Sequence, residues 1–262
     1  MYPVLLELGP ITVHSYGFMI AMGFVAVILG LRRRAHEINM EPNETLDIAL
    51  LAMIFGIIGA RLYYVLVYDF SHYVKNPLDV FALNQGGLVF HGGLILGTIA
   101  VIIYLKAKKV SVVETADLAA LLIPVAYAFG RVGCFLNGCC HGIETDSFIG
   151  VSFTEFGTTA YHPAQLYSVV LGLGIYGFIL WQRPRRTFGG QAFLSYLIIY
   201  NAGRFFIEFL RVNPTYFGLV TGAQITSIIL IGIACGLYPF IRRKFAYEED
   251  EAVEEIDESS TA

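Results

Sequence analysis

Five charged or ionisable residues interrupt stretches of this sequence that are otherwise apolar: Arg61, His91, Arg131, Arg204 and Glu208. A charged side chain at the centre of a bilayer costs about 2.5–3.5 kcal/mol on insertion scales. A chain that carries several must pair them, hydrate them or use them, so such residues indicate a functional site by default. Arginine binds phosphate oxygens bidentately, and neutral histidine can act as a base. The set therefore suits an anionic substrate that carries a phosphate.

The densest motif covers residues 130–142 and reads GRVGCFLNGCCHG. Its glycines free the backbone to turn and to expose N–H groups, and the guanidinium of Arg131 beside them suits a phosphate. Taken alone, the motif fits equally well an arginine that only extends its charge to the membrane interface, among glycines that only pack.

The cysteines of this motif, Cys134, Cys139 and Cys140, precede His141 and invite comparison with a metal site. Their spacing, C-x4-C-C-H, is not one of the usual paired patterns, and adjacent cysteines chelate one tetrahedral ion poorly. We therefore expect no metal here. Small packing residues, or a disulfide on an oxidising side of the membrane, are the favoured interpretations.

Tyr200, Arg204 and Glu208 follow one another at intervals of four residues, so a helix would place them on one face. Arg204 and Glu208 are spaced for an i,i+4 ion pair. Such a pair would lower the cost of burying both charges. It would also let the glutamate orient the arginine toward an anion, and the two roles are compatible.

His91 lies in the motif FHGG at residues 90–93. A lone histidine at a helix start is usually a capping or packing residue. Cations nearby would favour the neutral imidazole, which is the form that can act as a base. Arg61 adjoins tyrosines in the motif GARLYY, where extension of its charge toward the interface would also explain it.

The elements that must position these residues are membrane helices. The chain has 262 residues, of which 56% are hydrophobic and 15% charged, and its mean hydropathy is +0.64. A soluble domain has about 25% charged residues, so this composition indicates an integral membrane protein. Eight of the 21 acidic residues lie from Glu248 onward. We expect residues 246–262 to be a solvated, disordered tail after one membrane domain over residues 1–245.

Seven apolar stretches, each near the roughly 20 residues that a spanning helix needs, predict an all-α polytopic bundle of seven transmembrane helices. They cover residues 16–31, 48–68, 88–105, 118–136, 165–181, 191–210 and 223–241. Alternate loops hold 12 of the 17 Lys and Arg residues. This positive-inside pattern predicts an N-terminus outside and a C-terminus in the cytoplasm.

The helix directions then place all five intramembrane residues in the outer half of the membrane. Chance would scatter them over both halves. We expect a polar cavity that opens toward the extracytoplasmic face, under loops at residues 69–87 and 137–164. The segment before Tyr16 is too short to span, and we expect it to lie along the outer interface.

In this order, GRVGCFLNGCCHG, FHGG, HPAQLY at residues 162–167 and the Arg204-x3-Glu208 pair resemble the prolipoprotein diacylglyceryl transferases. The resemblance runs from His14 to the seventh helix. It implies a multi-pass enzyme of the bacterial plasma (inner) membrane, with its active site facing the extracytoplasmic side. Such an enzyme moves the diacylglyceryl group of phosphatidylglycerol onto the lipobox cysteine thiol of a prolipoprotein, forming a thioether and releasing glycerol phosphate. The implied partners are phosphatidylglycerol, prolipoprotein signal peptides and membrane lipids, with no nucleic acid, no metal and no other cofactor.

The same resemblance implies roles for individual residues. Arg131 and Arg204 match two functional arginines that would hold the phosphate, and His91 matches a histidine that would be the base; these three are the expected catalytic residues. Tyr16, Asn137, Gly142, Tyr200 and Glu208 match further site positions and are the expected substrate-binding residues. Arg61 is expected to bind substrate with them, not from the resemblance but as one of the intramembrane charges. The family pattern G-R-x-G-N-F-x-N-x-E is broken where Cys134 replaces the first Asn and Cys139 replaces the Glu, so no role is carried onto those two positions.

The same residues could also occur in other classes of membrane protein. A transporter for an anionic solute is the main alternative, because polar groups in a bundle and glycine-broken helices also serve transport. Confinement of the polar residues to one half of the membrane, and the lack of an inverted repeat, disfavour it. An intramembrane protease lacks support, since there is no G-x-S-x-G motif and no pair of intramembrane aspartates. A purely structural protein would leave three intramembrane arginines unexplained.

Overall fold

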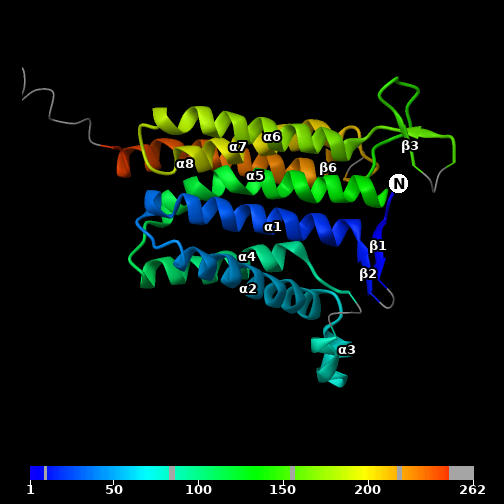
Figure 1. The fold of residues 1–262 in the computed structure, drawn as a ribbon, viewed down its shortest axis with the longest axis horizontal. Helices are drawn as coiled ribbons and strands as arrows, with labels where there is room; N and C mark the ends of the chain where they lie inside the picture. The colour runs from blue at the N-terminus through cyan, green and yellow to red at the C-terminus, as the bar shows by residue number, and fades with distance from the viewer. Residues whose placement is uncertain (9–10, 83–85, 154–156, 217–219, 248–262) are drawn as a thin grey trace, which may run out of the picture. The chain divides into compact units, whose positions relative to one another are not determined.

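The computed structural model describes residues 1–8, 11–82, 86–153, 157–216 and 220–247 (Figure 1). It is 71% helical, in agreement with the predicted all-α class. The predicted acidic tail lies outside the described residues, apart from Ala246 and Tyr247. The chain divides into two compact units, residues 1–26 with 116–262 (unit 1) and residues 27–115 (unit 2), and each is described by itself.

Among the described residues, seven long helices lie over the predicted apolar stretches, and one short helix lies in the predicted loop at residues 69–87. They are α1 (Ser15–Arg33), α2 (Glu44–Val67), α3 (Phe70–Lys75), α4 (Phe90–Ala107), α5 (Val112–Asn137), α6 (Ala164–Gln182), α7 (Gln191–Glu208) and α8 (Gly222–Lys244). Among the described residues, α1, α2, α4, α5, α6 and α8 are long and apolar enough to cross a membrane. The chain is therefore a polytopic helical membrane protein.

Helix α7 differs from the other long helices in composition. It has 18 residues but carries Gln191, Asn201, Arg204 and Glu208, which lower its hydropathy. It packs against both α6 and α8, so its polar residues lie within the bundle of unit 1 rather than along an exposed face. A helix that carries site residues inward does not need the uniformly apolar surface of its neighbours.

The described residues also form three two-stranded antiparallel sheets, all in unit 1, before α1, between α5 and α6, and between α7 and α8. They pair β1 (Val4–Leu8) with β2 (Ile11–His14), β3 (Val151–Ser152) with β4 (Ala160–Tyr161) and β5 (Thr215–Tyr216) with β6 (Val220–Thr221). Short 3₁₀ turns cover Ala35–Ile38, Pro77–Phe81 and Arg183–Arg185. The N-terminal segment is thus a hairpin. It is tied to the end of α5 because the Tyr2 N–H donates to the Leu136 carbonyl at 3.0 Å.

Unit 1 is built on helices α5 to α8, which run alongside one another in Figure 1. One core cluster joins the first three of these helices through the buried residues Ala120, Leu121, Ile175, Ile179 and Ala192. A second cluster joins α7 to α8 through Leu194 and Ala234, capped by Phe188 from the preceding loop. These two clusters fix α7 between its neighbours.

A buried carboxylate holds the start of α7. Asp117, in α5, accepts hydrogen bonds from the N–H groups of Gly190 at 2.9 Å and Phe193 at 2.8 Å. It also forms an ion pair with Arg186 at 2.5 Å, and its side chain is fully buried. The first N–H groups of a helix lack partners within the helix and carry partial positive charge, so a carboxylate satisfies both needs.

Unit 2 is held by close packing of α2 against α4 through glycines. A Cβ at Gly93 would lie 2.6 Å from the Gly56 carbonyl oxygen, and one at Gly97 would lie 3.1 Å from the Ala52 carbonyl oxygen. Small residues at this spacing allow two helices to approach backbone to backbone. By contrast, no atom in the described part of the chain lies within 4 Å of a Cβ built at Gly232 or Gly236, which have the same spacing in α8.

Candidate active site

Arg131 lies near the C-terminal end of α5, half-buried against aromatic rings. Its guanidinium carbon is 4.9 Å from the centre of the Tyr127 ring, one turn earlier on the same helix. Tyr127 in turn meets Tyr200 of α7 edge to face, with ring centres 5.3 Å apart. A cation over an aromatic face is stabilised without losing its hydrogen-bond donors, so Arg131 keeps donors for an anion.

The predicted face of α7 forms as expected. Tyr196 and Tyr200 stack with ring centres 5.6 Å apart, and the Arg204 guanidinium pairs with the Glu208 carboxylate one turn further on. The predicted i,i+4 ion pair is therefore confirmed. The edge contact between Tyr127 and Tyr200 brings the α5 helix of Arg131 beside the α7 helix of Arg204, within one unit of the structure.

Glu208 is buried, with 2% of its surface exposed. Its Oε2 pairs with Arg204, while its Oε1 accepts hydrogen bonds from Asn213 Nδ2 at 2.7 Å and the Thr221 hydroxyl at 2.9 Å. Arg211 Nε lies 4.0 Å from Oε2. A buried charge needs such partners, and their arrangement fixes the carboxylate that orients Arg204.

Asn213 and Thr221 were not predicted from the sequence. Thr221 did carry a readable signal, because the run Thr221-Gly222-Ala223-Gln224 has the form of a capping box. The structure contains that box: the Gln224 N–H donates to the Thr221 hydroxyl oxygen at 3.3 Å, and the Thr221 N–H donates to Gln224 Oε1 at 2.9 Å. Nothing in the sequence linked this cap to Glu208.

Two further predicted residues lie at the end of α5 and in the turn that follows it. Asn137 is the last residue of that helix and is half-buried. Gly142 is buried where three segments meet, and its N–H donates to the His162 carbonyl at 2.7 Å. A Cβ at Gly142 would lie 2.8 Å from the His162 Cβ and would overlap the Leu210 carbonyl oxygen, so only glycine fits.

Tyr16 is the second residue of α1 and is 45% exposed. Its backbone packs on Gly133 of α5, where a built Cβ would lie 3.3 Å from the Tyr16 Cα. The first turn of α1 is thereby placed against the motif that contains Arg131.

Arg61, in unit 2, is placed differently from what a substrate-binding role suggests. It is 4% exposed and donates to the carbonyl oxygens of Asp79 at 2.6 Å, Gly86 at 2.7 Å and Val80 at 2.9 Å. Its guanidinium also faces the ring of Tyr73 at 5.2 Å. These contacts anchor the loop between α3 and α4, and a role in binding substrate stays a prediction.

His91, also in unit 2, is the second residue of α4 and is exposed. Its ring meets that of Phe90 edge to face at 6.0 Å. The next residue, Gly92, approaches the Gly59 backbone so closely that a Cβ there would overlap the Gly59 carbonyl oxygen. The glycines of the FHGG motif are therefore explained by helix packing, which leaves the histidine without a structural explanation.

The turn after α5 also gathers three cysteines, Cys134, Cys139 and Cys140. A hydrogen bond from the Cys134 thiol lowers the pKa of the Cys140 thiol to about 5, although burial acts in the opposite direction. A hydrogen bond from Cys139 and the charges of Arg211 and Arg131 also lower this pKa. The surroundings of Cys140 therefore favour its thiolate.

An apolar groove of about 370 Å³ opens beside the site in unit 1. Its walls are formed by Ile149, His162, Tyr167, Phe206, Ile207 and Leu210. His162 Nδ1 and the Tyr167 hydroxyl lie 2.9 Å apart and satisfy each other, so the exposed lining is almost entirely apolar. A groove of this kind suits a hydrocarbon chain.

Comparison with known proteins identifies the family. A model of the family described as prolipoprotein diacylglyceryl transferase matches residues 3–240. A phosphatidylglycerol--prolipoprotein diacylglyceryl transferase from Clostridium tetani is 35% identical over 240 residues, which are 89% of this chain and 96% of that relative. Proteins of the same name from Bordetella bronchiseptica (34% identical, 92% and 95% covered) and Clostridioides difficile (36%, 87% and 89%) are similarly related. With its site motifs at the ends of α5 and α7, this chain belongs to the prolipoprotein diacylglyceryl transferase family.

Proposed function

We propose that this chain transfers the diacylglyceryl group of phosphatidylglycerol to the thiol of a lipobox cysteine in prolipoproteins, the first step of bacterial lipoprotein maturation. The products are a thioether and glycerol phosphate. The observation that carries the proposal is the pair of arginines on α5 and α7, Arg131 over Tyr127 and Arg204 braced by Glu208, in a chain of this family.

The reaction breaks the bond between a diacylglyceryl carbon and a phosphate oxygen. Negative charge grows on the departing phosphate, and fixed cations nearby stabilise that charge in the transition state. Arg131 presents its donors from an aromatic face, and Arg204 is oriented by a carboxylate that is itself held by two hydrogen bonds. Both arginines are therefore set in place before substrate binds, which lowers the reorganisation needed during the reaction.

The attacking group is the lipobox thiol, whose reference pKa is about 8.5. The thiolate is the nucleophile, so a base assists at neutral pH. We assign that role to His91, because an imidazole has a reference pKa of about 6.5 and His91 is exposed at the start of α4. Tyr16, Asn137, Gly142 and Tyr200 are assigned to substrate binding, and Arg61 to the same group through the loop that it anchors.

The proposed setting is the bacterial plasma membrane, crossed seven times with α7 as the sixth span. Arg and Lys residues gather at the C-terminal ends of α1, α4, α6 and α8, so those ends face the cytoplasm and the N-terminus lies outside. In this orientation α5 and α7 end, and α4 begins, at the extracytoplasmic side. Helix α7 crosses despite its polar residues because α6 and α8 cover it.

The proposal is tested with the purified full chain in detergent, phosphatidylglycerol and a lipobox peptide. Mass spectrometry should find a diacylglyceryl adduct on the peptide cysteine, and phosphatidylethanolamine serves as the donor control. Arg131→Gln should abolish transfer in protein that still folds. The matched control is Arg185→Gln, since Arg185 is exposed over Trp181 beyond the end of α6 and should not matter.

Two results would count against the proposal. No adduct from folded wild-type protein, with several phospholipids offered, would contradict the activity. Substantial transfer by folded Arg131→Gln protein would instead leave the activity standing and remove the role given to Arg131.

A further inference from the structure

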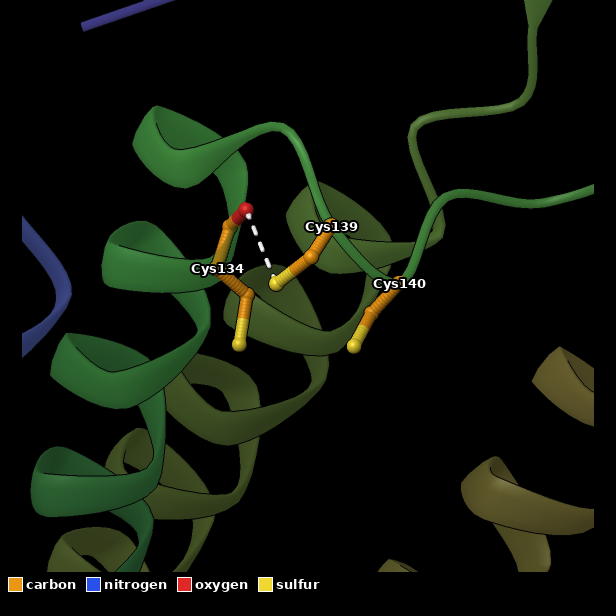
Figure 2. Close-up of side chains that lie close together, drawn as sticks. All are labelled: Cys134, Cys139 and Cys140. Carbon is orange, nitrogen blue, oxygen red and sulfur yellow. Dashed lines mark hydrogen bonds between the residues drawn. The ribbon is translucent and has the colours of Figure 1, made fainter. Parts of the chain in front are cut away.

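The sulfur atoms of Cys134, Cys139 and Cys140 all lie within 4.8 Å of one another, and their side chains point into one region beside the end of α5 (Figure 2). In tetrahedral zinc coordination with Zn–S distances of about 2.3 Å, neighbouring sulfurs lie about 3.8 Å apart. The present separations exceed this ligand spacing by at most about 1 Å. Adjacent cysteines were expected to chelate one ion poorly, but the backbone conformation at residues 138–140 brings their sulfurs close to that of Cys134.

The end of α5 brings Cys134 and Cys139 together. The Cys139 N–H donates to the Cys134 carbonyl and the Gly138 N–H donates to the Phe135 carbonyl, each at 3.1 Å. Gly138 has a φ of 79°, in the left-handed region. This is a Schellman motif, which places the third residue before the cap in contact with the second residue after it. Here those two positions are both cysteines.

Cys140 joins them through an unusual backbone conformation. Its φ is 66°, which non-glycine residues adopt only at a cost. The turn directs its side chain toward the same region as those of Cys134 and Cys139, instead of away from them (Figure 2). Strain of this kind persists only where the surroundings enforce it, and it concentrates at functional sites.

The turn is also held from α6. Gln165, which is fully buried, donates from Nε2 to the Cys139 carbonyl at 2.7 Å. The cysteine positions are thus fixed from two helices before any ligand arrives. A site organised in advance binds its ligand at a lower entropic cost.

The charges around the three sulfurs suit a thiolate complex. Three thiolates and one divalent cation leave a net charge of −1. Arg131 and Arg211 both act electrostatically on Cys140, so this charge has compensation nearby. Soft thiolate ligands select zinc and related ions over magnesium or calcium.

We propose that Cys134, Cys139 and Cys140 bind one Zn²⁺ ion through their three sulfurs. Binding forms three Zn–S bonds, each sulfur that still carries a proton releases it to solvent, and no oxidation state changes. The fourth coordination position of the tetrahedral ion is left to a water molecule or to another donor atom. The ion would fasten the turn that begins at Asn137, and the transfer reaction is not routed through it.

Disulfide formation is the alternative to zinc binding for these thiols. Adjacent Cα atoms are about 3.8 Å apart, shorter than the 4.4–6.8 Å that most disulfides span, so a Cys139–Cys140 bond is disfavoured. A disulfide would then join Cys134 to one of the other two and leave one thiol free. Zinc binding uses all three, and this difference can be measured.

The test uses the full chain, purified in detergent under reducing conditions and supplied with Zn²⁺. Metal analysis after removal of free ion should find one Zn²⁺ per chain. Titration with Co²⁺ should give thiolate-to-cobalt charge-transfer absorption that Zn²⁺ abolishes. Because changes around ligands already cost about 10–100-fold in affinity, Cys134→Ser, Cys139→Ser and Cys140→Ser should each lower Zn²⁺ affinity by more than about a hundredfold. Cys235→Ser is the matched control, since Cys235 lies in α8 outside the cluster, and it should bind like wild type.

Three outcomes would overturn the proposal. The first is wild-type protein without bound Zn²⁺ and without the cobalt signal. The second is retention of Zn²⁺ by the variant with all three serines. The third is a disulfide within the cluster that persists in protein isolated without reductant and excludes metal. Each measurement is made without the transfer assay, so the metal site can fail while the proposed activity stands.

Discussion

The Thr221 hydroxyl donates to Glu208 Oε1 at 2.9 Å while its oxygen accepts the Gln224 N–H at 3.3 Å. One side chain therefore begins helix α8 and holds the carboxylate that pairs with Arg204 on α7. The stability of a helix start and the orientation of a proposed catalytic arginine depend on the same oxygen atom.

Replacement of Thr221 by Val should affect both properties. Loss of an N-cap costs about 1 kcal/mol of folding free energy. Loosening of Glu208 should also lower kcat/KM for phosphatidylglycerol by roughly tenfold, the change that corresponds to about 1.4 kcal/mol in the transition state. Denaturant unfolding and the peptide transfer assay measure the two effects. Thr221→Ser keeps the hydroxyl and should behave like wild type in both; a loss in Thr221→Ser with none in Thr221→Val, which keeps the methyl group, would show that packing of the methyl group, not the hydroxyl, matters.

Asp117 should be important for stability but not for chemistry. Asp117→Asn removes the charge that pairs with Arg186 and weakens acceptance from the Gly190 and Phe193 N–H groups. Loss of one partner of a buried ion pair typically costs about 3–5 kcal/mol. We expect a loss of this order in the free energy of unfolding in detergent, with KM unchanged in the protein that remains folded.

The control for Asp117 is Asp146→Asn, because Asp146 is an exposed aspartate in the same unit. It should leave unfolding unchanged. A normal unfolding curve for Asp117→Asn would mean that the α7 N-terminus is held by its core contacts alone.

A substitution at Arg61 can distinguish anchoring of the loop between α3 and α4 from direct binding of substrate, two roles that the sequence left open. In Arg61→Lys the positive charge stays, but the three donors of an ammonium group share one nitrogen and cannot reach the carbonyls of Asp79, Val80 and Gly86 as the three nitrogens of the guanidinium do. Each hydrogen bond to a charged group is worth about 1.5–3 kcal/mol. Limited proteolysis should therefore cleave between residues 76 and 89 at least about tenfold faster. If anchoring is the whole role, KM for phosphatidylglycerol changes little; a large rise in KM with unchanged proteolysis would restore Arg61 as a direct substrate ligand.

The helices were predictable because a bilayer imposes a length and a hydropathy that the sequence displays directly. The stretch predicted at residues 16–31 is helical from Ser15 to Arg33, and the one predicted at 191–210 is helical from Gln191 to Glu208. The Arg204–Glu208 pair was predictable for a similar reason, since helix geometry alone brings residues four apart together.

Contacts that depend on tertiary structure were not predictable. The partners of Arg61 are backbone carbonyls, and because every residue has one, the order of side chains does not predict which carbonyls will be used. Asn213 reaches Glu208 from just beyond the end of α7, and Thr221 reaches it only because β6 pairs antiparallel with β5. The three cysteines converge because Gly138 and Cys140 both adopt positive φ. A glycine in the sequence suggests such a conformation, whereas a cysteine does not.

Gly142 provides a steric test of the turn that carries the site. In Gly142→Ala the new Cβ would lie 2.8 Å from the His162 Cβ and 3.0 Å from the His162 carbonyl oxygen, and would overlap the Leu210 carbonyl oxygen. Backbone atoms cannot rotate away, so the turn after α5 must shift, at a cost of about 1–3 kcal/mol. Because this turn follows Asn137 directly, transfer activity should fall together with stability.

Gly174→Ala is the matched control for Gly142→Ala, because no atom of the described chain lies within 4 Å of a Cβ built at Gly174 in α6. Alanine is favoured over glycine within a helix, so this variant should keep full activity and gain up to about 1 kcal/mol. Thermal unfolding in detergent and the peptide transfer assay, run on both variants, give the comparison. If Gly142→Ala matched wild type in both measurements, the close approach of residues 142, 162 and 210 would not be needed for the site, and the glycine would have to be explained by contact with substrate.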